Sequence, residues 1–471
     1  MRKTFMGVRL RRLREERGLT QLALAKALEI SPSYLNQLEN NQRPLTVPVL
    51  LKINSAFGID VQMFSDDDEA RLIADLRDAL SEVGPGGPVS LAEIRELATA
   101  MPAVGKALVG LHRRNRQMLE RTEAMLSTLG DDKRAFTALA PPMPYEEVRD
   151  FFYGKGNHIP ELDEAAERLY AEAGLAPGQV AAGLSAYLGR RHDVRIEFTE
   201  GEGTPKRRFD PRSRVIRLSP FLRPGQVAFQ LATQIAFLEQ RPVIDAVTAA
   251  APLSSDEARN LARLGLAHYF AGALILPYGR FLAEAERLRY DIERLATRFG
   301  VGFETVCHRL STLQRPAARG VPFFLIRVDR AGNISKRQSA TDFHFSRVGG
   351  TCPLWNVYEA FSTPGKVLTQ AARMPDGRAY LWIARTVSRN NGGFGTPAKT
   401  FAVALGCDIA HAGRLVYSKG LDLSDPDAAV PIGAGCKVCE RAHCAQRAFP
   451  PIGRPIAVDE NTSRPAPYSV A

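Results

Sequence analysis

The sequence has no long hydrophobic run, and this absence bears on where the protein works. No apolar segment approaches the roughly 20 residues that a membrane-spanning helix needs, and the N-terminus lacks the apolar core of a secretory signal peptide. We therefore expect a cytoplasmic protein. Cysteine is scarce, with six among 471 residues. In a reducing compartment such thiols are not expected to form disulfides, so a cluster of them indicates metal or redox chemistry.

The overall composition is that of an ordinary globular protein, with 45% hydrophobic and 24% charged residues. Because 471 residues exceed what one core supports, we expect about three domains. The net charge of +11 favours an anionic partner. The positive excess is concentrated before Asp66, where 10 lysines and arginines accompany 5 carboxylates. This distribution suits contact with DNA phosphates.

Residues 20–44 predict two short helices joined by a tight turn. Thr20 can cap the first helix. Ser31 followed by Pro32 marks the start of the second, because proline at the first helical position loses no needed donor. Leu35 and Leu38 then face inward. The stretch resembles the Xre/Cro-type helix-turn-helix family over about residues 7 to 62, where we expect a compact bundle of about five helices.

The opposite face of the second helix carries short amides and hydroxyls. Such side chains suit the major groove, where Asn and Gln can pair with adenine edges. Gln21 is placed to reach a phosphate or to brace this helix. A solvated polar face is the alternative. The predicted DNA-binding residues are Gln21, Ser31, Ser33, Tyr34, Asn36, Gln37, Asn40, Arg43 and Arg12.

Residues 66–141 are expected to form a helical linker. Carboxylates at 66–69 favour a helix start, and the Pro-Gly-Gly-Pro stretch at 85–88 predicts a hinge. A later helix carries a 4-3 repeat with Asn in its middle, a pattern that often fixes the register of a parallel two-stranded coil. The repeat consists of Val104, Leu108, Leu111, Asn115, Met118, Thr122 and Met125. We expect a homodimer, or higher homo-oligomer; packing of this helix inside its own subunit is the alternative.

Residues 142–315 are expected to form a separate domain. Helices at 162–174 and 178–189 precede two extended segments, 193–200 and 207–220, and a long helix from about Gly225. The order strand, helix and then FAGALILP is similar to the IrrE/ImmA-like minimal zinc-peptidase domain.

In that family the first helix carries His-Glu-x-x-His, which binds zinc and supplies the general base. The matching positions here are Thr233, Gln234 and Phe237, and a later glutamate ligand is matched by Ala273. These residues cannot build the metal site, so we expect no peptidase activity. The hydrolytic cleft of that family could here have become a ligand pocket, or it could have filled in to become core. If it is a pocket, its expected residues are Gln230, Thr233, Gln234, Phe237 and His268.

Residues 316–450 are expected to form an α+β domain, with a flexible tail at 451–471. Strands are predicted on both sides of the turn at 331–333, at 379–389 and at 400–408. Cys436, Cys439 and Cys444 are spaced for convergence on one metal centre. The fourth ligand is Cys352, Cys407 or His443, and the centre is a [4Fe-4S] cluster or zinc. Unligated thiols are the alternative, and Cys307 is expected in the core.

Over nearly its full length the chain resembles the short-chain fatty-acyl-responsive transcriptional regulators. The resemblance is carried by SPSYLNQLENNQRP, FQLATQIAFLE, FAGALILP, CHRLSTLQRP, GGTCPLWN and the three C-terminal cysteines. It implies an Xre-type helix-turn-helix domain (1–65), the linker, a degenerate IrrE-like sensing domain and a C-terminal domain that binds a [4Fe-4S] cluster in some members.

The resemblance also implies operator DNA as partner and an acyl-CoA such as propionyl-CoA or acetyl-CoA as effector, in the control of propionate or acetate metabolism. Basic residues could meet the CoA phosphates; the candidates are Arg207, Arg208, Arg212 and Arg214. One alternative is a redox-responsive regulator that senses through the cysteine cluster without binding CoA. A more distant alternative is an IrrE-like metallopeptidase.

Overall fold

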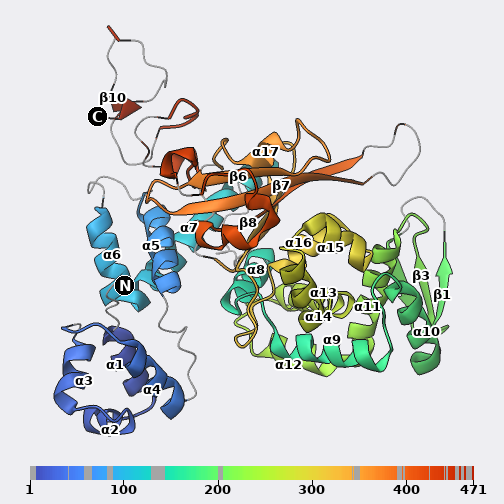
Figure 1. The fold of residues 1–471 in the computed structure, drawn as a ribbon, viewed down its shortest axis with the longest axis horizontal. Coiled ribbons are helices and arrows are strands. Elements are labelled where there is room, and N and C mark those ends of the chain that lie inside the picture. Colours follow the sequence, from blue (N-terminus) through green and yellow to red (C-terminus); the bar gives the residue numbers. More distant parts are fainter. Residues whose placement is uncertain are drawn as a thin grey trace. The chain divides into compact units, whose positions relative to one another are not determined.

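A computed structural model describes most of the chain. The described residues are 7–40, 42–57, 66–81, 89–128, 144–199, 205–341, 343, 351–389, 395, 398–423, 425–439, 441, 444–450, 456–457, 461–462 and 469–470. The chain divides into two compact units, which are described separately (Figure 1). The first comprises residues 1–136, 342–350 and 434–471, and the second comprises residues 137–341 and 351–433. Within the described residues, no helix is long and apolar enough to cross a membrane.

The first unit begins with a helical bundle whose caps were predicted correctly. Its helices are α1 (Gly7–Glu16), α2 (Gln21–Ala27), α3 (Pro32–Glu39) and α4 (Val47–Phe57). The Thr20 hydroxyl accepts a hydrogen bond from the Ala23 amide at 3.2 Å, and the Ser31 hydroxyl accepts one from the Tyr34 amide at 3.1 Å. Both interactions satisfy an amide that has no partner inside its helix. The closing turn of the predicted five-helix bundle lies outside the described residues.

The bundle closes over a leucine-rich core. Its buried members are Leu10, Leu13, Leu24, Ala25, Leu28, Leu35, Leu38, Leu45, Val49 and Ile53. Leu35 and Leu38 are the two inward positions expected from the spacing in α3. The polar face of α3 therefore lies on the outside of the bundle.

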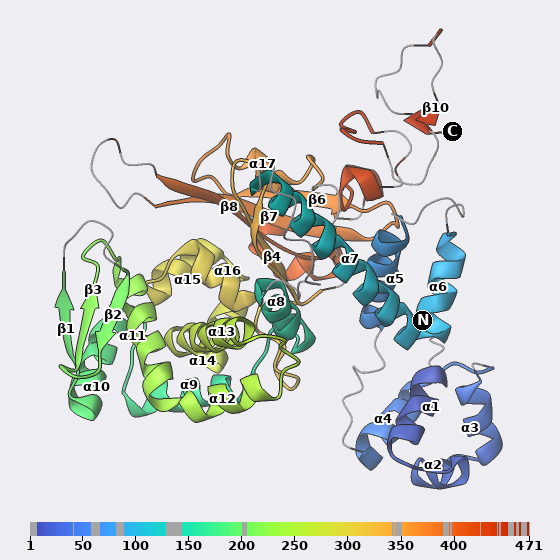
Figure 2. The ribbon, with the colours of Figure 1, turned by 180° about the vertical axis from the view of Figure 1, so that it is seen from behind.

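Three helices follow as a second small bundle (Figure 2). They are α5 (Asp66–Ser81), α6 (Leu91–Ala100) and α7 (Pro102–Thr128), and each contacts both others. The helix predicted after the acidic patch starts at Asp66 as expected. Their core contains Leu72, Leu76, Ala79, Ile94, Ala98 and Val109. The predicted hinge at 85–88 lies outside the described residues.

The second unit starts with a helical part built around one central helix. Its helices are α8 (Pro144–Gly154), α9 (Pro160–Glu172), α10 (Val180–His192), α11 (Pro224–Glu239), α12 (Arg241–Ala249), α13 (Asp256–Ile275), α14 (Tyr278–Arg287), α15 (Ile292–Phe299) and α16 (Phe303–Leu310). The central helix, α13, packs against α8, α9, α11, α12 and α16. Its buried face is apolar apart from the Tyr269 hydroxyl, which accepts a hydrogen bond from the Ile159 amide at 3.1 Å.

The two extended segments predicted after α10 form three strands. They are β1 (Arg195–Phe198), β2 (Arg207–Asp210) and β3 (Val215–Leu218), in the order β1-β3-β2. The second segment was expected to be extended, and it forms two strands because the chain turns after Asp210. The Asp210 carboxylate accepts hydrogen bonds from the amides of Arg212 at 2.9 Å and Ser213 at 3.4 Å. Such Asx interactions compete with continued pairing.

A six-stranded sheet forms the rest of the second unit. It contains β4 (Phe324–Val328), β5 (Ile334–Ser339), β6 (Leu368–Arg373), β7 (Ala379–Arg389), β8 (Lys399–Asp408) and β9 (Val430–Pro431), with the short helix α17 (Asn356–Glu359) between β5 and β6. The order is β5-β4-β8-β7-β6-β9, and the pair β6–β9 is parallel while the others are antiparallel. Strands β4, β5, β7 and β8 were predicted, whereas β6 was missed because LTQAAR has no strong β pattern.

The two faces of β7 illustrate how the sheet is held. Leu381 and Ile383 are buried in the same core as the helices of this unit. Trp382 points to the other face, where Phe324 and Trp355 pack against it with ring centroids 4.7 and 5.2 Å away. The alternation follows the two-residue period of a strand. One face of the sheet is therefore joined to the helical part, and the other has its own aromatic cluster.

The predicted tail is not wholly without regular structure. Within residues 451–471, the two-residue strands β10 (Ile456–Ala457) and β11 (Ser469–Val470) pair antiparallel. The boundaries and flexibility assigned to this tail remain predictions.

A buried ion pair ties α9 to α16. Arg309 donates to Asp163 Oδ1 at 2.6 Å, and the exposed fractions of the two side chains are 3% and 0%. The guanidinium also donates to the carbonyl of Leu276 at 2.9 Å and to the hydroxyl of Thr312 at 3.1 Å. Burial alone would raise the pKa of Asp163, but the charge of Arg309 and the hydrogen bonds of His158 and Arg309 outweigh it, so the pKa lies below its ordinary value.

Removal of one partner of this ion pair should destabilise the second unit strongly. We expect Asp163→Ala to lower the free energy of unfolding by about 3–5 kcal/mol at neutral pH, because Arg309 stays buried without its carboxylate. Since the folded pKa of Asp163 is depressed, the wild type should lose this contribution as pH falls below about 4, and the variant should not. Denaturant unfolding of the second unit at pH 7 and at acidic pH measures both effects.

Glu164→Ala provides the matched control, because Glu164 lies on the same helix and forms only an exposed pair with Arg168 at 3.9 Å. It should change stability by less than about 1 kcal/mol. Equal losses for the two variants would contradict the role assigned to the buried pair.

Candidate functional site

The exposed face of α3 is organised by a buried carboxylate. The Glu39 side chain is 1% exposed, and its Oε1 accepts a hydrogen bond from Arg14 Nε at 2.7 Å. Gln21 Nε2 donates to Glu39 Oε2 at 3.0 Å. Glu39 therefore joins α1, α2 and α3 at one point. The hydrogen bond and charge of Glu39 raise the pKa of Arg14 above its ordinary value.

The predicted DNA-binding side chains gather around this face. Ser31, Ser33, Asn36, Asn40 and Arg43 are exposed, whereas Gln21, Tyr34 and Gln37 are half-buried. The guanidinium of Arg43 lies 5.7 Å from the centre of the Tyr34 ring, which holds it beside the first turn of α3. The Arg12 side chain lies outside the described residues. Contact of these residues with DNA remains a prediction.

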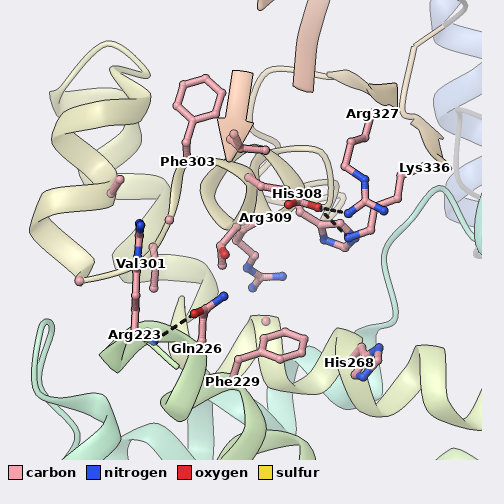
Figure 3. A pocket seen from close by; sticks show the side chains of 18 of the residues that line it. Arg223, Gln226, Phe229, His268, Val301, Phe303, His308, Arg309, Arg327 and Lys336 are labelled. Atoms are coloured by element: carbon pink, nitrogen blue, oxygen red, sulfur yellow. Dashed lines mark hydrogen bonds and ion pairs between the residues drawn. The ribbon is translucent and has the colours of Figure 1, made fainter. Parts of the chain in front are cut away.

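A second candidate site is a large cavity in the second unit. Its volume is about 1490 Å³, and it lies between the helical part and the sheet. The N-terminal ends of α11 and α16 both line it, together with residues of α13, β4, β5 and β7. Figure 3 shows Arg327 and Lys336 close to His308 on one side of this cavity, with Arg223 beside Val301 on another.

Positive charge predominates in the cavity lining. The lining cations are Lys206, Arg223, Arg309, Arg327, Lys336 and Arg385, and the lining carboxylates are Glu293 and Glu304. Burial and the nearby Lys336 lower the pKa of His308 to about 3, so its imidazole is neutral at physiological pH. The positive charge of the lining therefore comes from lysine and arginine.

Two sets of ion pairs connect the walls of the cavity. The Glu304 carboxylate, on α16, lies 2.8 Å from Arg327 of β4 and 3.0 Å from Lys336 of β5. Glu293, on α15, lies 2.8 Å from Arg385 of β7. These contacts join the helical part to the sheet across the cavity. An anion that enters the cavity would compete with the two carboxylates for these cations.

The structure separates the residues predicted for the ligand pocket. Gln230 and His268 line the cavity, and the rings of His268 and Phe229 lie 5.3 Å apart. Thr233 and Gln234 are buried in the core instead, and Phe237 packs against Arg207. None of the latter three is among the described residues that line the cavity. Ligand contact by all five remains a prediction.

The basic strand residues proposed for CoA phosphates do not line this cavity among the described residues. Arg207 donates to the Gln230 carbonyl at 3.2 Å, and burial lowers its pKa to about 10. Arg214 donates to the His192 carbonyl at 2.7 Å. The cations that do line the cavity come from segments far apart in sequence, and no local motif marks them.

The C-terminal cysteines lie in a segment held by one arginine. The buried guanidinium of Arg447 donates to the carbonyls of Cys436 and Cys439, both at 3.2 Å, and to that of Arg441. Cys439 is buried, and Cys436 and Cys444 are half-buried. Within the part of the chain that the structure describes, no group of three or more His, Cys, Asp or Glu side chains is arranged to hold a metal ion.

The other predicted cysteines lie in the second unit. The Cys352 sulfur accepts a hydrogen bond from the Gly433 amide at 3.4 Å. Cys407 is buried on β8, which raises the pKa of its thiol. Cys307 is fully buried in the core, as predicted, and His443 lies outside the described residues. The metal site and its fourth ligand therefore remain predictions.

Family models match three consecutive parts of the chain. A helix-turn-helix model matches residues 10–64, an IrrE N-terminal-like domain model matches residues 190–311, and the model of the short-chain fatty acyl coenzyme A regulator C-terminal domain matches residues 312–468. The last two meet close to the predicted boundary at residue 315. All the predicted domain boundaries remain predictions.

Characterised relatives are similar over nearly the whole chain. The HTH-type transcriptional regulator PrpR of Mycobacterium tuberculosis is 54% identical over 99% of this chain and 96% of its own length. RamB of the same species is 51% identical over 100% of this chain and 99% of its own length. A propionyl-CoA carboxylase regulator of Cereibacter sphaeroides is 42% identical over 99% of both chains.

A solved structure has the same fold over most of the chain. The Mycobacterium tuberculosis transcriptional regulator aligns with a TM-score of 0.68 and 55% identity, covering 70% of this chain and all of that one. The three matched models and the identity to whole regulators point to the same family. The chain belongs to the short-chain fatty acyl coenzyme A regulator family of transcriptional regulators.

Proposed function

We propose that an acyl-CoA bound in the large cavity controls how tightly this regulator binds its operator DNA. The observation that supports the proposal is the combination of size and charge in the cavity. Pockets for small ligands usually measure roughly 300–1,000 Å³, so a cavity of about 1490 Å³ has room for a ligand as long as a coenzyme A ester. Among the described residues, six cations and two carboxylates line it, which suits an anion with several phosphates.

The acyl group would lie against the apolar part of the lining. Phe152, Phe229 and Val301 supply apolar surface there. The Cereibacter sphaeroides relative is named as a regulator of propionyl-CoA carboxylase. Propionyl-CoA is therefore the first effector to test. Other short acyl chains differ from it by only a methylene or two, each worth about 0.8 kcal/mol when buried.

Control of DNA binding requires that the ligand favour one arrangement of the protein. In the described structure, Glu304 holds Arg327 and Lys336 across the cavity. A bound phosphate would replace Glu304 as the partner of these cations and change how the helical part is held to the sheet. Differential binding of this kind typically couples two sites by about 1–3 kcal/mol.

We do not propose a peptidase. The positions that match the zinc ligands and base of IrrE-like peptidases carry Thr233, Gln234, Phe237 and Ala273, and Thr233 donates its hydroxyl to the Phe229 carbonyl at 2.7 Å. This donor set cannot bind zinc. Zinc-dependent cleavage of a protein substrate would support the peptidase alternative.

Calorimetric titration with propionyl-CoA, acetyl-CoA, butyryl-CoA and free CoA tests the cavity. We expect saturable binding with an acyl preference, and about 10- to 150-fold weaker binding for Arg223→Ala, because a charge-assisted contact to phosphate contributes about 1.5–3 kcal/mol. Arg168→Ala is the control, since Arg168 is an exposed cation of α9 outside the cavity.

Wild-type affinity should persist in Arg168→Ala. Absence of binding to all four compounds would contradict the proposal and favour redox control through the cysteines. Equal weakening by both substitutions would indicate a general charge effect rather than a contact in the cavity.

We also propose that the regulator forms a homodimer through α7. Val104 and Leu111 are 49% and 59% exposed, although both are large apolar residues. The face that contains Gly105 and Val109 is instead buried against α5 and α6. At about 100° per residue, the exposed apolar stripe lies about 120° around the helix from the buried face. Asn115 continues the stripe and can pair with its own counterpart in a parallel dimer.

Leu111→Lys should prevent this dimer, because it places two like charges in the seam. Sedimentation equilibrium should give a dimer for the wild type and a monomer for the variant at the same concentration. Lys106→Ala is the control, since Lys106 lies on a different face of α7. A Leu111→Lys protein that remains dimeric would exclude this helix as the interface.

Finally, we propose that Cys436, Cys439 and Cys444 supply thiolates to a [4Fe-4S] cluster or a zinc ion, with Cys352 as the fourth ligand. The donor chemistry supports it, since three thiols lie within nine residues. Arg447 supports it as well, because it holds the carbonyls of two of these cysteines. Bound there, the metal would cross-link the C-terminal segment.

Metal analysis and visible absorption of anaerobically purified protein test this site. We expect bound iron with broad visible absorption, or zinc without it, and loss of either metal in Cys436→Ser. Cys307→Ser is the control, because Cys307 is buried in the core of the second unit. Metal-free wild-type protein would rule the site out.

A further inference from the structure

We propose that Gln37 and Asn36 read different bases: Gln37 recognises adenine through both ends of its amide, whereas Asn36 only donates and favours guanine. The inference rests on the DNA-binding function of this family. It comes from the hydrogen bonds on the exposed face of α3, where charged neighbours fix the orientation of the Asn40 and Gln21 amides, and these two fix that of Asn36.

The orientation of Asn40 follows from Arg11. The Arg11 guanidinium lies 2.5 Å from the Asn40 amide oxygen, and a guanidinium can only donate. Asn40 must therefore turn its oxygen to Arg11 and its nitrogen to the other side. That nitrogen donates to Asn36 Oδ1 at 2.9 Å.

The orientation of Gln21 follows from Glu39 in the same way. The buried Glu39 carboxylate only accepts, so Gln21 turns its nitrogen to Glu39 at 3.0 Å. The same Gln21 nitrogen lies 3.3 Å from Asn36 Oδ1. The Arg11 guanidinium thus fixes the orientation of the Asn40 amide, and the Glu39 carboxylate fixes that of the Gln21 amide. Both amides are neighbours of Asn36.

The oxygen of Asn36 is consequently occupied twice. It accepts from Gln21 and from Asn40, and these two bonds use both of its lone pairs. Only the Asn36 NH₂ group remains for DNA, and it can only donate. A bidentate pair with adenine needs an acceptor for N6 and a donor for N7 on the same amide. Asn36 cannot provide both without breaking the network.

The side-chain amide of Gln37, unlike that of Asn36, is not engaged by the network. Among the described residues, no hydrogen bond or ion pair engages its side-chain amide. Its oxygen and nitrogen are both available, as the bidentate contact with adenine N6 and N7 requires. Guanine presents two adjacent acceptors, O6 and N7, in the major groove. A donor-only amide therefore favours guanine over adenine.

Selection of binding sites from a randomised DNA duplex pool tests this assignment with the full-length protein. In Gln37→Ala we expect one adenine position of the wild-type site to lose about tenfold of its preference. In Asn36→Ala a guanine position should lose its preference instead.

Asn36→Asp is the sharper variant. It keeps Oδ1 as acceptor for Gln21 and Asn40 but presents an acceptor to DNA where the wild type presents a donor. Because acidic side chains accept from cytosine N4, the preference at that position should change from guanine to cytosine. Asn54→Asp on α4 makes the same charge change away from α3 and should leave every base preference unchanged.

The outcomes are distinct. An adenine preference that is lost in Asn36→Ala, or a base preference unchanged in Asn36→Asp, would overturn the assignment while leaving the DNA-binding function intact. Failure of the wild type to enrich any sequence would instead contradict sequence-specific DNA binding itself, and the assignment with it.

Discussion

The ion pair between Asp163 and Arg309 connects the packing of the second unit to its cavity. Arg309 lies at the C-terminal end of α16, where it binds the carboxylate of Asp163 on α9 and the carbonyl of Leu276, which follows α13. It also lines the cavity. One guanidinium thus belongs to the buried core and to the candidate ligand site. Since a buried charge without its partner is costly, the cavity wall cannot move without moving the helices that hold this arginine.

A buried charge also organises the candidate DNA-binding face of α3. Glu39 is as buried as Asp163, and Arg14 and Gln21 satisfy it. The consequence differs, because the Glu39 network reaches the surface through Gln21 and Asn36. It therefore influences which polar groups α3 presents on its exposed face. A buried charge fixes the geometry of a site in both units, although neither charge itself need touch a ligand.

Local signals in the sequence predicted much of this structure. The caps at Thr20 and Ser31, the turn before β5 and the strands β7 and β8 each depend on residues close in sequence. The cavity could not be predicted in this way, because Arg223, Glu304 and Arg327 meet only after the helical part packs on the sheet. The IrrE-like resemblance directed attention to Thr233 and Gln234, which are buried in the core. The cavity lies instead between the helical part and the sheet of the second unit.

We propose that ligand binding in the cavity and DNA binding are coupled. Thermodynamic linkage requires the coupling to be reciprocal. The most direct measurement is the affinity for a selected operator duplex, at fixed salt, with and without saturating propionyl-CoA, together with the affinity for propionyl-CoA with and without saturating duplex. We predict that both affinities change by the same factor, about 5-fold to 150-fold. A DNA affinity that stays unchanged although propionyl-CoA binds would contradict the coupling of the two sites.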